Sequence, residues 1–200
     1  QDMPILTEAV MNLSDLAQSN FGLILFSVLG SILGIRMLIN THRGRRVWDA
    51  LILRIPIFGP LMQKTIVSRF SGTFATLIRS GVPILGALEI VSKTTGNVHY
   101  SEAIEKSAEA VRQGENLGNP LSRTKRFPPM VCRMIAIGER SGSLEQLLEK
   151  VSQFYDSEVR STVKQLTSLI EPFLILIMGG VVGTMVLAMF LPLLQMIGNM

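Results

Sequence analysis

The most constraining feature of this sequence is its C-terminal end, where Pro172 to Met200 form 29 consecutive positions without a charged residue. A helix rises about 1.5 Å per residue and a bilayer core is about 30 Å thick, so roughly 20 apolar residues are enough to cross it. Lipid offers no hydrogen-bond partners, and a helix pairs its backbone N–H and C=O groups internally. We therefore expect residues 168–198 to form a transmembrane helix.

A second uncharged run lies near the other end. It extends over 20 residues from Leu16 to Ile35 and stops at Arg36, whose long stem can place its charge at the lipid headgroups. We expect a transmembrane helix over 16–40, preceded by an acidic extracytoplasmic segment, 1–15, with helical spacing. The flank before this run is acidic, which argues against a signal peptide. Because the chain starts with Gln and with its N-terminus outside, we expect an earlier part with its own span.

The charge distribution predicts which side of the membrane the middle of the chain occupies. All 19 Lys and Arg residues lie between Arg36 and Lys164, and residues 36–171 hold 12 acidic residues, for a net charge of +7. A basic segment is compatible with nucleic-acid binding. Between two apolar runs it is explained more economically by the positive-inside rule, which places it in the cytoplasm. We expect no nucleic acid as a partner.

Residues 41–63 are expected to form a basic interfacial connector. Its basic cluster consists of His42, Arg43, Arg45 and Arg46. Its apolar positions share one helix face and are Val47, Trp48, Leu51, Ile52 and Ile55. Two interpretations fit this pattern: a helix lying on the inner leaflet with Trp48 at headgroup level, or a connector helix packed against the protein. Pro56 and Pro60 then predict an elbow.

Residues 64–167 are expected to form a cytoplasmic antiparallel bundle of about six helices, within an all-α membrane protein. Apolar residues at helical spacing predict helices over 64–81, 83–96, 98–113 and 128–142, with a loop or at most a turn or two of helix over 117–127. Gly142 and Ser143 predict a helix end followed by a new start at Leu144. That last helix shows no breaker until Pro172, so we expect it to run from the bundle into the membrane, with a kink at Pro172.

The sequence lacks the motifs of several enzyme classes. It holds no phosphate-binding G-x-x-x-x-G-K-[ST], no G-x-G-x-x-G, no H-E-x-x-H and no G-x-S-x-G. His42 and His99 are far apart and are expected at the surface, the carboxylates form no acid/base couple, and Cys132 sits in an apolar stretch typical of a buried core residue. We expect no enzyme, no catalytic residue, no cofactor and no metal.

The two apolar runs carry features that favour helix packing. Their glycines recur four residues apart or beside such a pair, at Gly30, Gly34, Gly179, Gly180 and Gly183. Such spacing lets helices approach closely, although glycine is common in membrane helices in any case. Glu171 lies just before Pro172 at the mouth of the last run. It is expected either to face water at headgroup level or to contact a partner helix.

Three stretches of this chain resemble one family. They read RFSGTFATLIRSGVPILGALEIVSKTTGN, FPPMVCRMIAIGERSGSLEQLLEKVSQFYDSEV and LTSLIEPFLILIMGGVVGTMVLAMFLPLLQMI. In this order they resemble the inner-membrane platform proteins of type II secretion systems and type IV pilus machines, over most of 56–197. The resemblance implies that this chain is the second half of such a protein, with its second span, second cytoplasmic domain and third span. Leu117 to Pro120 depart from the family, which usually continues there into a short helix.

The resemblance implies a non-enzymatic platform in the bacterial inner membrane, with the bundle facing the cytoplasm. Its expected partners are a separate cytoplasmic secretion or pilus ATPase, pilin or pseudopilin subunits, other inner-membrane assembly proteins and further copies of the chain. Arg123, Lys125 and Arg126 are the candidate contact for the ATPase, or else form a solvated basic loop. The alternative function is a membrane-transport subunit whose helical domain couples to an ATPase. A pilus, a secretion system and a competence machine remain open as the host machine.

Overall fold

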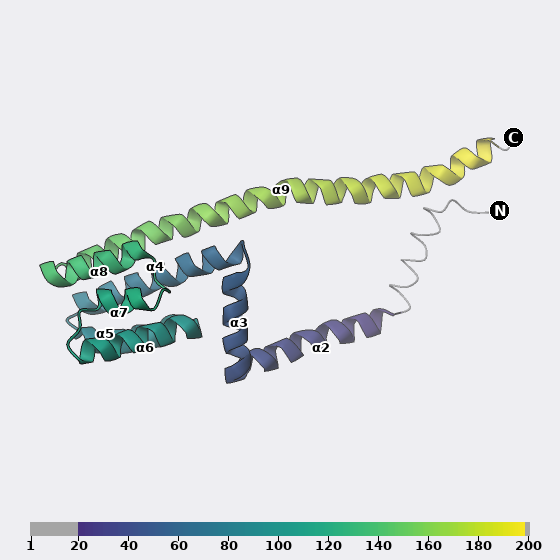
Figure 1. Cartoon of the computed structure of the whole chain (residues 1–200). Coiled ribbons are helices and arrows are strands. Elements are labelled where there is room, and N and C mark those ends of the chain that lie inside the picture. Colours follow the sequence, from purple (N-terminus) through teal and green to yellow (C-terminus); the bar gives the residue numbers. More distant parts are fainter. Residues whose placement is uncertain (1–19, 199–200) are drawn as a thin grey trace. The chain divides into compact units, whose positions relative to one another are not determined.

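The computed structural model describes residues 20–198 of the chain, and between those limits the regular structure is helical, with no strand. The helices are α2 (Phe21–Asn40), α3 (His42–Arg54), α4 (Phe58–Arg79), α5 (Ile84–Thr94), α6 (Val98–Arg112), α7 (Gly118–Arg123), α8 (Pro129–Ser141) and α9 (Leu144–Gly198). The all-helical prediction is confirmed for this part of the chain (Figure 1). The segment predicted for 1–15 and the first residues of the predicted span 16–40 lie outside it.

The chain divides into two compact units. One is Leu38–Lys164, and the other holds the residues up to Met37 together with those from Gln165 on. In the first unit, α4 packs on α5, α5 on α6, α6 on α7 and α7 on α8. The apolar face of α4 contributes to the core of this unit, and its Phe70 and Phe74 are fully buried.

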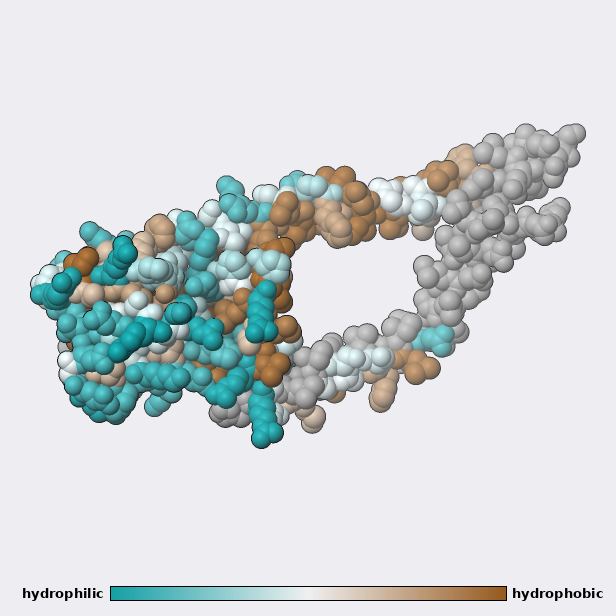
Figure 2. Space-filling model, in the orientation of Figure 1, coloured by the Kyte–Doolittle hydropathy of each residue, from teal (hydrophilic) through white to brown (hydrophobic). Residues whose placement is uncertain are grey.

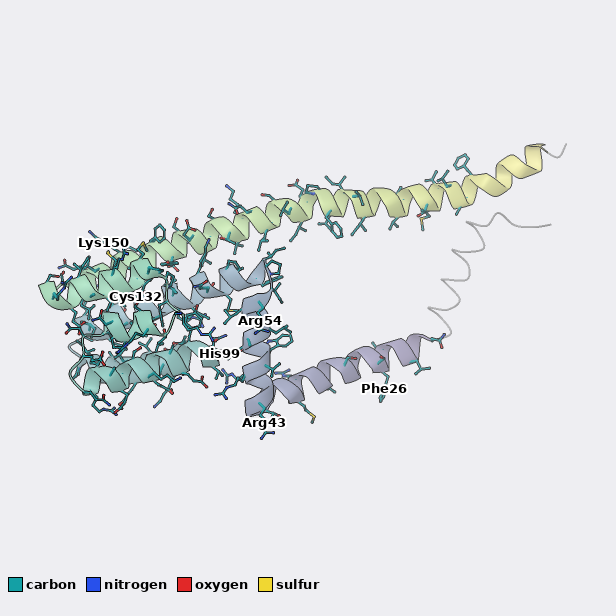
Figure 3. The ribbon with its side chains drawn as sticks, in the orientation of Figure 1. Phe26, Arg43, Arg54, His99, Cys132 and Lys150 are labelled. Carbon is teal, nitrogen blue, oxygen red and sulfur yellow. The ribbon has the colours of Figure 1, made fainter. Side chains whose placement is uncertain are left out.

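The core of this unit takes residues from every helix from α4 to the start of α9. Phe127, which follows α7, packs against Phe70 with their ring centroids 4.8 Å apart and meets Tyr100 edge-on at 5.4 Å. Cys132 of α8 is buried, as its apolar surroundings predicted, and burial raises the pKa of its thiol. Figure 3 places this cysteine inside the bundle.

The elbow after α3 differs in detail from its prediction. The helix break covers residues 55–57, and α4 begins at Phe58 instead of Lys64, at an angle of 109° to α3. Pro60 therefore lies in the first turn of α4, where a missing backbone N–H costs no helical hydrogen bond. Gly59 is buried against the carbonyl of Leu53, and a side chain there would collide with that backbone atom. Pro60 therefore does not end a helix, because the first turn of a helix tolerates proline.

The turn between α8 and α9 follows its prediction. Gly142 takes the left-handed conformation with φ of 70°, and α9 begins at Leu144. Buried apolar residues of α9 lie near its start and are Leu144, Leu148, Val151 and Tyr155. Phe154 in the same part of the helix is half exposed. Helical structure continues through Pro172 to Gly198, so no helix ends at this proline.

The second unit exposes its apolar side chains in the isolated chain. Phe26 of α2 and Leu176 of α9 are typical, at 80% and 73% exposed. Figure 2 shows the hydrophobic colouring along this part of α9, against a largely hydrophilic surface on the bundle. By length and composition, α9 is the single helix within the described residues that is able to cross a membrane alone.

Candidate functional site

An open groove of about 490 Å³ lies on the surface of the Leu38–Lys164 unit, between α6 and α7. Its walls are His99, Glu102, Ala103, Lys106 and Ala110 from α6, and Pro120, Arg123, Thr124 and Arg126 from α7 and the residues after it. We call this the α6–α7 groove. Two of the three predicted contact residues, Arg123 and Arg126, line it, whereas Lys125 is exposed beside it.

The short helix α7 forms one wall because its first residue is glycine. A Cβ on Gly118 would lie 2.6 Å from the Cβ of Ala136 and 2.9 Å from the carbonyl oxygen of Cys132, both on α8. The glycine therefore permits α7 to sit directly on α8. The backbone N–H of Leu117 donates to Glu139 Oε2 at 2.8 Å, which ties the start of α7 to the same helix. The short helix expected from the family is therefore present, and it begins at Gly118, within the residues that depart from the family pattern.

The segment after α7 is held in place by two hydrogen bonds to its backbone. The hydroxyl of Tyr100 donates to the carbonyl oxygen of Arg126 at 3.0 Å, and the amide of Gln63 donates to the same oxygen at 3.4 Å. Lys125 has φ of 55°, a left-handed backbone conformation that residues other than glycine seldom adopt. Burial raises the pKa of Tyr100 to about 12, so its hydroxyl keeps the donated proton at neutral pH. The backbone that carries the basic residues is therefore well ordered by its neighbours.

The groove is electropositive. Lys106, Arg123 and Arg126 line it with a single carboxylate, Glu102. Glu102 pairs with Arg46, and Arg123 pairs with Glu115. The Arg46 guanidinium, which donates a hydrogen bond to Glu102, holds the pKa of that carboxyl below its ordinary value. Lys106 and Arg126 form no ion pair with any residue between Asn20 and Phe190 whose side chain is described. Such a surface is suited to carboxylates of an acidic partner segment.

Sequence reasoning missed the contribution of α6 to this site. His99, Glu102, Lys106 and Ala110 follow one another by three or four residues and so share a helix face. That spacing is visible in the sequence, but of these residues only His99 was singled out from it, as a surface residue. Only packing shows that this face lies against α7.

The other predicted site residues lie on the second unit. Gly30 and Gly34 are on α2, and Gly179, Gly180 and Gly183 are on α9. A Cβ built on any of them would meet no described atom within 4 Å, so these faces are open in the isolated chain. Glu171 and Pro172 are exposed on α9. Within the described residues, no group of three or more His, Cys, Asp or Glu side chains is arranged to hold a metal ion.

Comparison with known proteins places this arrangement in a family. Residues 70–192, more than half of the chain, match the family described as type II secretion system (T2SS), protein F. The chain belongs to the type II secretion system protein F family. The resemblance carried by the three stretches quoted above is confirmed.

The protein F family includes relatives from both secretion and pilus machines. The chain is 40% identical over 201 residues to the type IV pilus assembly protein PilC of Myxococcus xanthus, covering 98% of this chain and 47% of that protein. It is 42% identical over 200 residues to PilC of Thermus thermophilus, covering 100% and 49%. It is 35% identical over 196 residues to the type II secretion system protein F of Pseudomonas aeruginosa, covering 98% and 48%.

The chain therefore spans about half the length of the curated relatives that it matches. Their names are those of assembly and secretion proteins and not of enzymes.

Proposed function

We propose that this chain is part of an inner-membrane platform that couples a cytoplasmic ATPase to the addition or removal of pilin or pseudopilin subunits. In this proposal 16–40 and 168–198 span the membrane, 41–63 connects the first span to the bundle, and 64–167 is the cytoplasmic bundle. The observation that carries the proposal is α9, which contributes core residues at its start and the charge-free segment at its end. A continuous helix transmits a rotation or tilt, which a flexible linker would absorb.

The start of α9 is fastened to α4 by polar contacts. Lys64 Nζ lies 2.9 Å from Glu158 Oε2 and 3.2 Å from Thr162 Oγ1, and Ser68 donates a hydrogen bond to Asp156. A Cβ on Gly72 would lie 2.8 Å from Ser152 Oγ, so the two helices are in close contact at this point. Motion of the bundle would therefore be imposed on α9 as far as Thr162.

The coupling is tested by inserting Gly-Gly-Ser-Gly after Gln165, just beyond these contacts. We expect the bundle to stay folded and the chain to stay in the membrane while fibre assembly or secretion is lost, because the inserted glycines break the helix. Four alanines inserted at the same point are the control, since they keep a helix and rotate it by only about 40°. Normal assembly with the glycine insertion would show that α9 is merely a tether.

The α6–α7 groove is the proposed contact for the ATPase, through an acidic segment of that protein. Replacing Lys106 and Arg126 by Glu should weaken ATPase binding at least tenfold, because attraction becomes repulsion across the interface. The matched control is Lys93→Glu with Lys150→Glu, two exposed lysines outside the groove, which changes the net charge equally. Equal loss of binding in both double variants would point to net charge and would refute the groove as the contact.

Self-association is proposed to use the glycine faces of the two spans. Because a side chain at Gly179 or Gly183 would meet no described atom of the same chain, these faces are free to receive another helix. Glu171 is proposed as a polar contact at the end of that interface. The same surface serves either the two spans of one copy or spans of neighbouring copies.

A further inference from the structure

One face of helix α3 contacts the bundle, and another face exposes apolar side chains. Its polar face is attached to the start of α6: Asp49, buried, accepts a hydrogen bond from the backbone N–H of Val98 at 2.7 Å. On the same face the carbonyl oxygen of Arg46 lies 3.2 Å from His99 Nε2. Figure 3 shows His99 at the end of α6 that meets α3. Leu53, half-buried, also packs against the core, so polar contacts and apolar packing together set the orientation of α3 on the bundle.

Although Ile52 is half-buried, much of the apolar face of α3 is left uncovered by the bundle. Its exposed apolar residues continue through the elbow into the first residue of α4 and are Val47, Trp48, Leu51, Ile55, Ile57 and Phe58. Val47 and Leu51, one turn apart, are 69% and 51% exposed. A continuous apolar strip of this kind on a folded unit marks a surface that binds something apolar.

Arginines lie at both ends of this strip. Figure 3 labels Arg43 near the start of α3 and Arg54 at its end. Arg45, two residues after Arg43, is also exposed. None of the three forms an ion pair with a side chain of the described residues. An apolar strip framed by unpaired cations is complementary to an anionic bilayer surface, whose acyl chains take the apolar side chains and whose headgroups take the arginines.

We propose that α3 and the elbow residues 55–58 lie in the headgroup region of the membrane and bind anionic lipid. A single residue, Thr41, separates α3 from α2 along the chain, so α3 starts where the proposed first span leaves the bilayer. This inference rests on the proposed membrane location of α2. It makes α3 the element that holds the start of α6, and with it His99 and Glu102 of the α6–α7 groove, at the membrane surface.

Trp48 makes the proposal directly measurable, because it is the sole tryptophan of the chain. The full chain is reconstituted in nanodiscs of zwitterionic lipid with and without phosphatidylglycerol. Tryptophan fluorescence is then recorded with lipids brominated near the headgroup, with lipids brominated near the chain end, and with an aqueous quencher. We expect the shallow bromines to quench Trp48 more than the deep ones, and phosphatidylglycerol to reduce the effect of the aqueous quencher.

Two sets of variants test the cause. Val47→Ser with Leu51→Ser should abolish the preference for shallow bromines and shift the emission to longer wavelength. Arg43→Gln, Arg45→Gln and Arg54→Gln together should remove the effect of phosphatidylglycerol. Ile90→Ser with Ile137→Ser is the matched control, since these two apolar residues are similarly exposed elsewhere on the unit and should leave the signal unchanged.

The outcomes separate this inference from the proposed function. If the chain inserts into the nanodisc but Trp48 stays open to the aqueous quencher, the lipid contact of α3 is refuted and the platform proposal stands. Protection of Trp48 from all three quenchers would mean that a protein surface covers the strip, which also refutes it. A chain that fails to insert overturns both proposals.

Discussion

At the scale of single residues, Tyr100 connects the core to the candidate site. Its ring packs against Phe127 and its hydroxyl holds the carbonyl oxygen of Arg126. A hydroxyl buried in this way needs its partner, because an unpaired buried polar group is costly. The second tyrosine, Tyr155, is also buried, and burial raises its pKa as well. No hydrogen bond of Tyr155 to the segment after α7 is present among the described contacts.

Tyr100→Phe should lower the free energy of unfolding by about 0.5–1.5 kcal/mol at neutral pH, through the lost hydrogen bond. The pKa of Tyr100 is raised to about 12 from 10.0, so the unfolded chain loses its proton first as the pH rises. Wild-type stability should therefore decline between those two pH values, and the variant should decline less. Denaturant unfolding in detergent at several alkaline pH values measures this. Tyr155→Phe is the control for ATPase binding, which should weaken in Tyr100→Phe alone. Because burial also raises the pKa of Tyr155, that variant should likewise decline less at alkaline pH.

At the scale of helices, close packing depends on a few glycines and not on all of them. A Cβ on Gly138 of α8 would lie 2.7 Å from Leu144 Cα and 3.2 Å from Leu144 N, which are backbone atoms of α9. On Gly86 of α5 the nearest atom is Val82 Cγ1 at 3.5 Å, an ordinary contact. The α8–α9 pair therefore has no room for a methyl group, whereas α5 has.

Gly138→Ala should destabilise the bundle by about 1–3 kcal/mol, because the start of α9 must move away from α8. Gly86→Ala makes the same chemical change inside a helix and should be neutral or stabilising by up to about 1 kcal/mol. Denaturant midpoints of the two variants measure the difference. Equal midpoints would contradict the close approach of α8 to α9.

At the scale of the whole molecule, the charge distribution predicts topology. The basic block 36–164 is proposed to be cytoplasmic, with both ends of the chain on the other side of the membrane. Cys132 is 4% exposed and burial raises the pKa of its thiol, so the native chain should react poorly with a maleimide. This makes the unmodified chain a low background for labelling.

Single cysteines at Asn12, Asn116 and Asn199, with Cys132 replaced by Ala, should report the topology. In intact cells a membrane-impermeant maleimide should label positions 12 and 199, and position 116 only after lysis. Asn116 is exposed and next to Glu115, whose pairing with Arg123 is thereby kept. Labelling of position 116 in intact cells would overturn the proposed orientation.

Local composition alone determined the helical class, the helix that starts at Leu144 and the charge-free segment after Glu171, because periodicity and charge act within a few turns of chain. The contacts between residues far apart in the sequence could not be predicted in this way. Asp49 is a charged residue of the predicted connector 41–63, yet it is buried and accepts a hydrogen bond from Val98, 49 positions away. The α6–α7 groove likewise brings Lys106 of α6 together with Arg126, which follows α7. Tertiary packing decided these contacts, since the rotation and register of one helix on another depend on side chains from both.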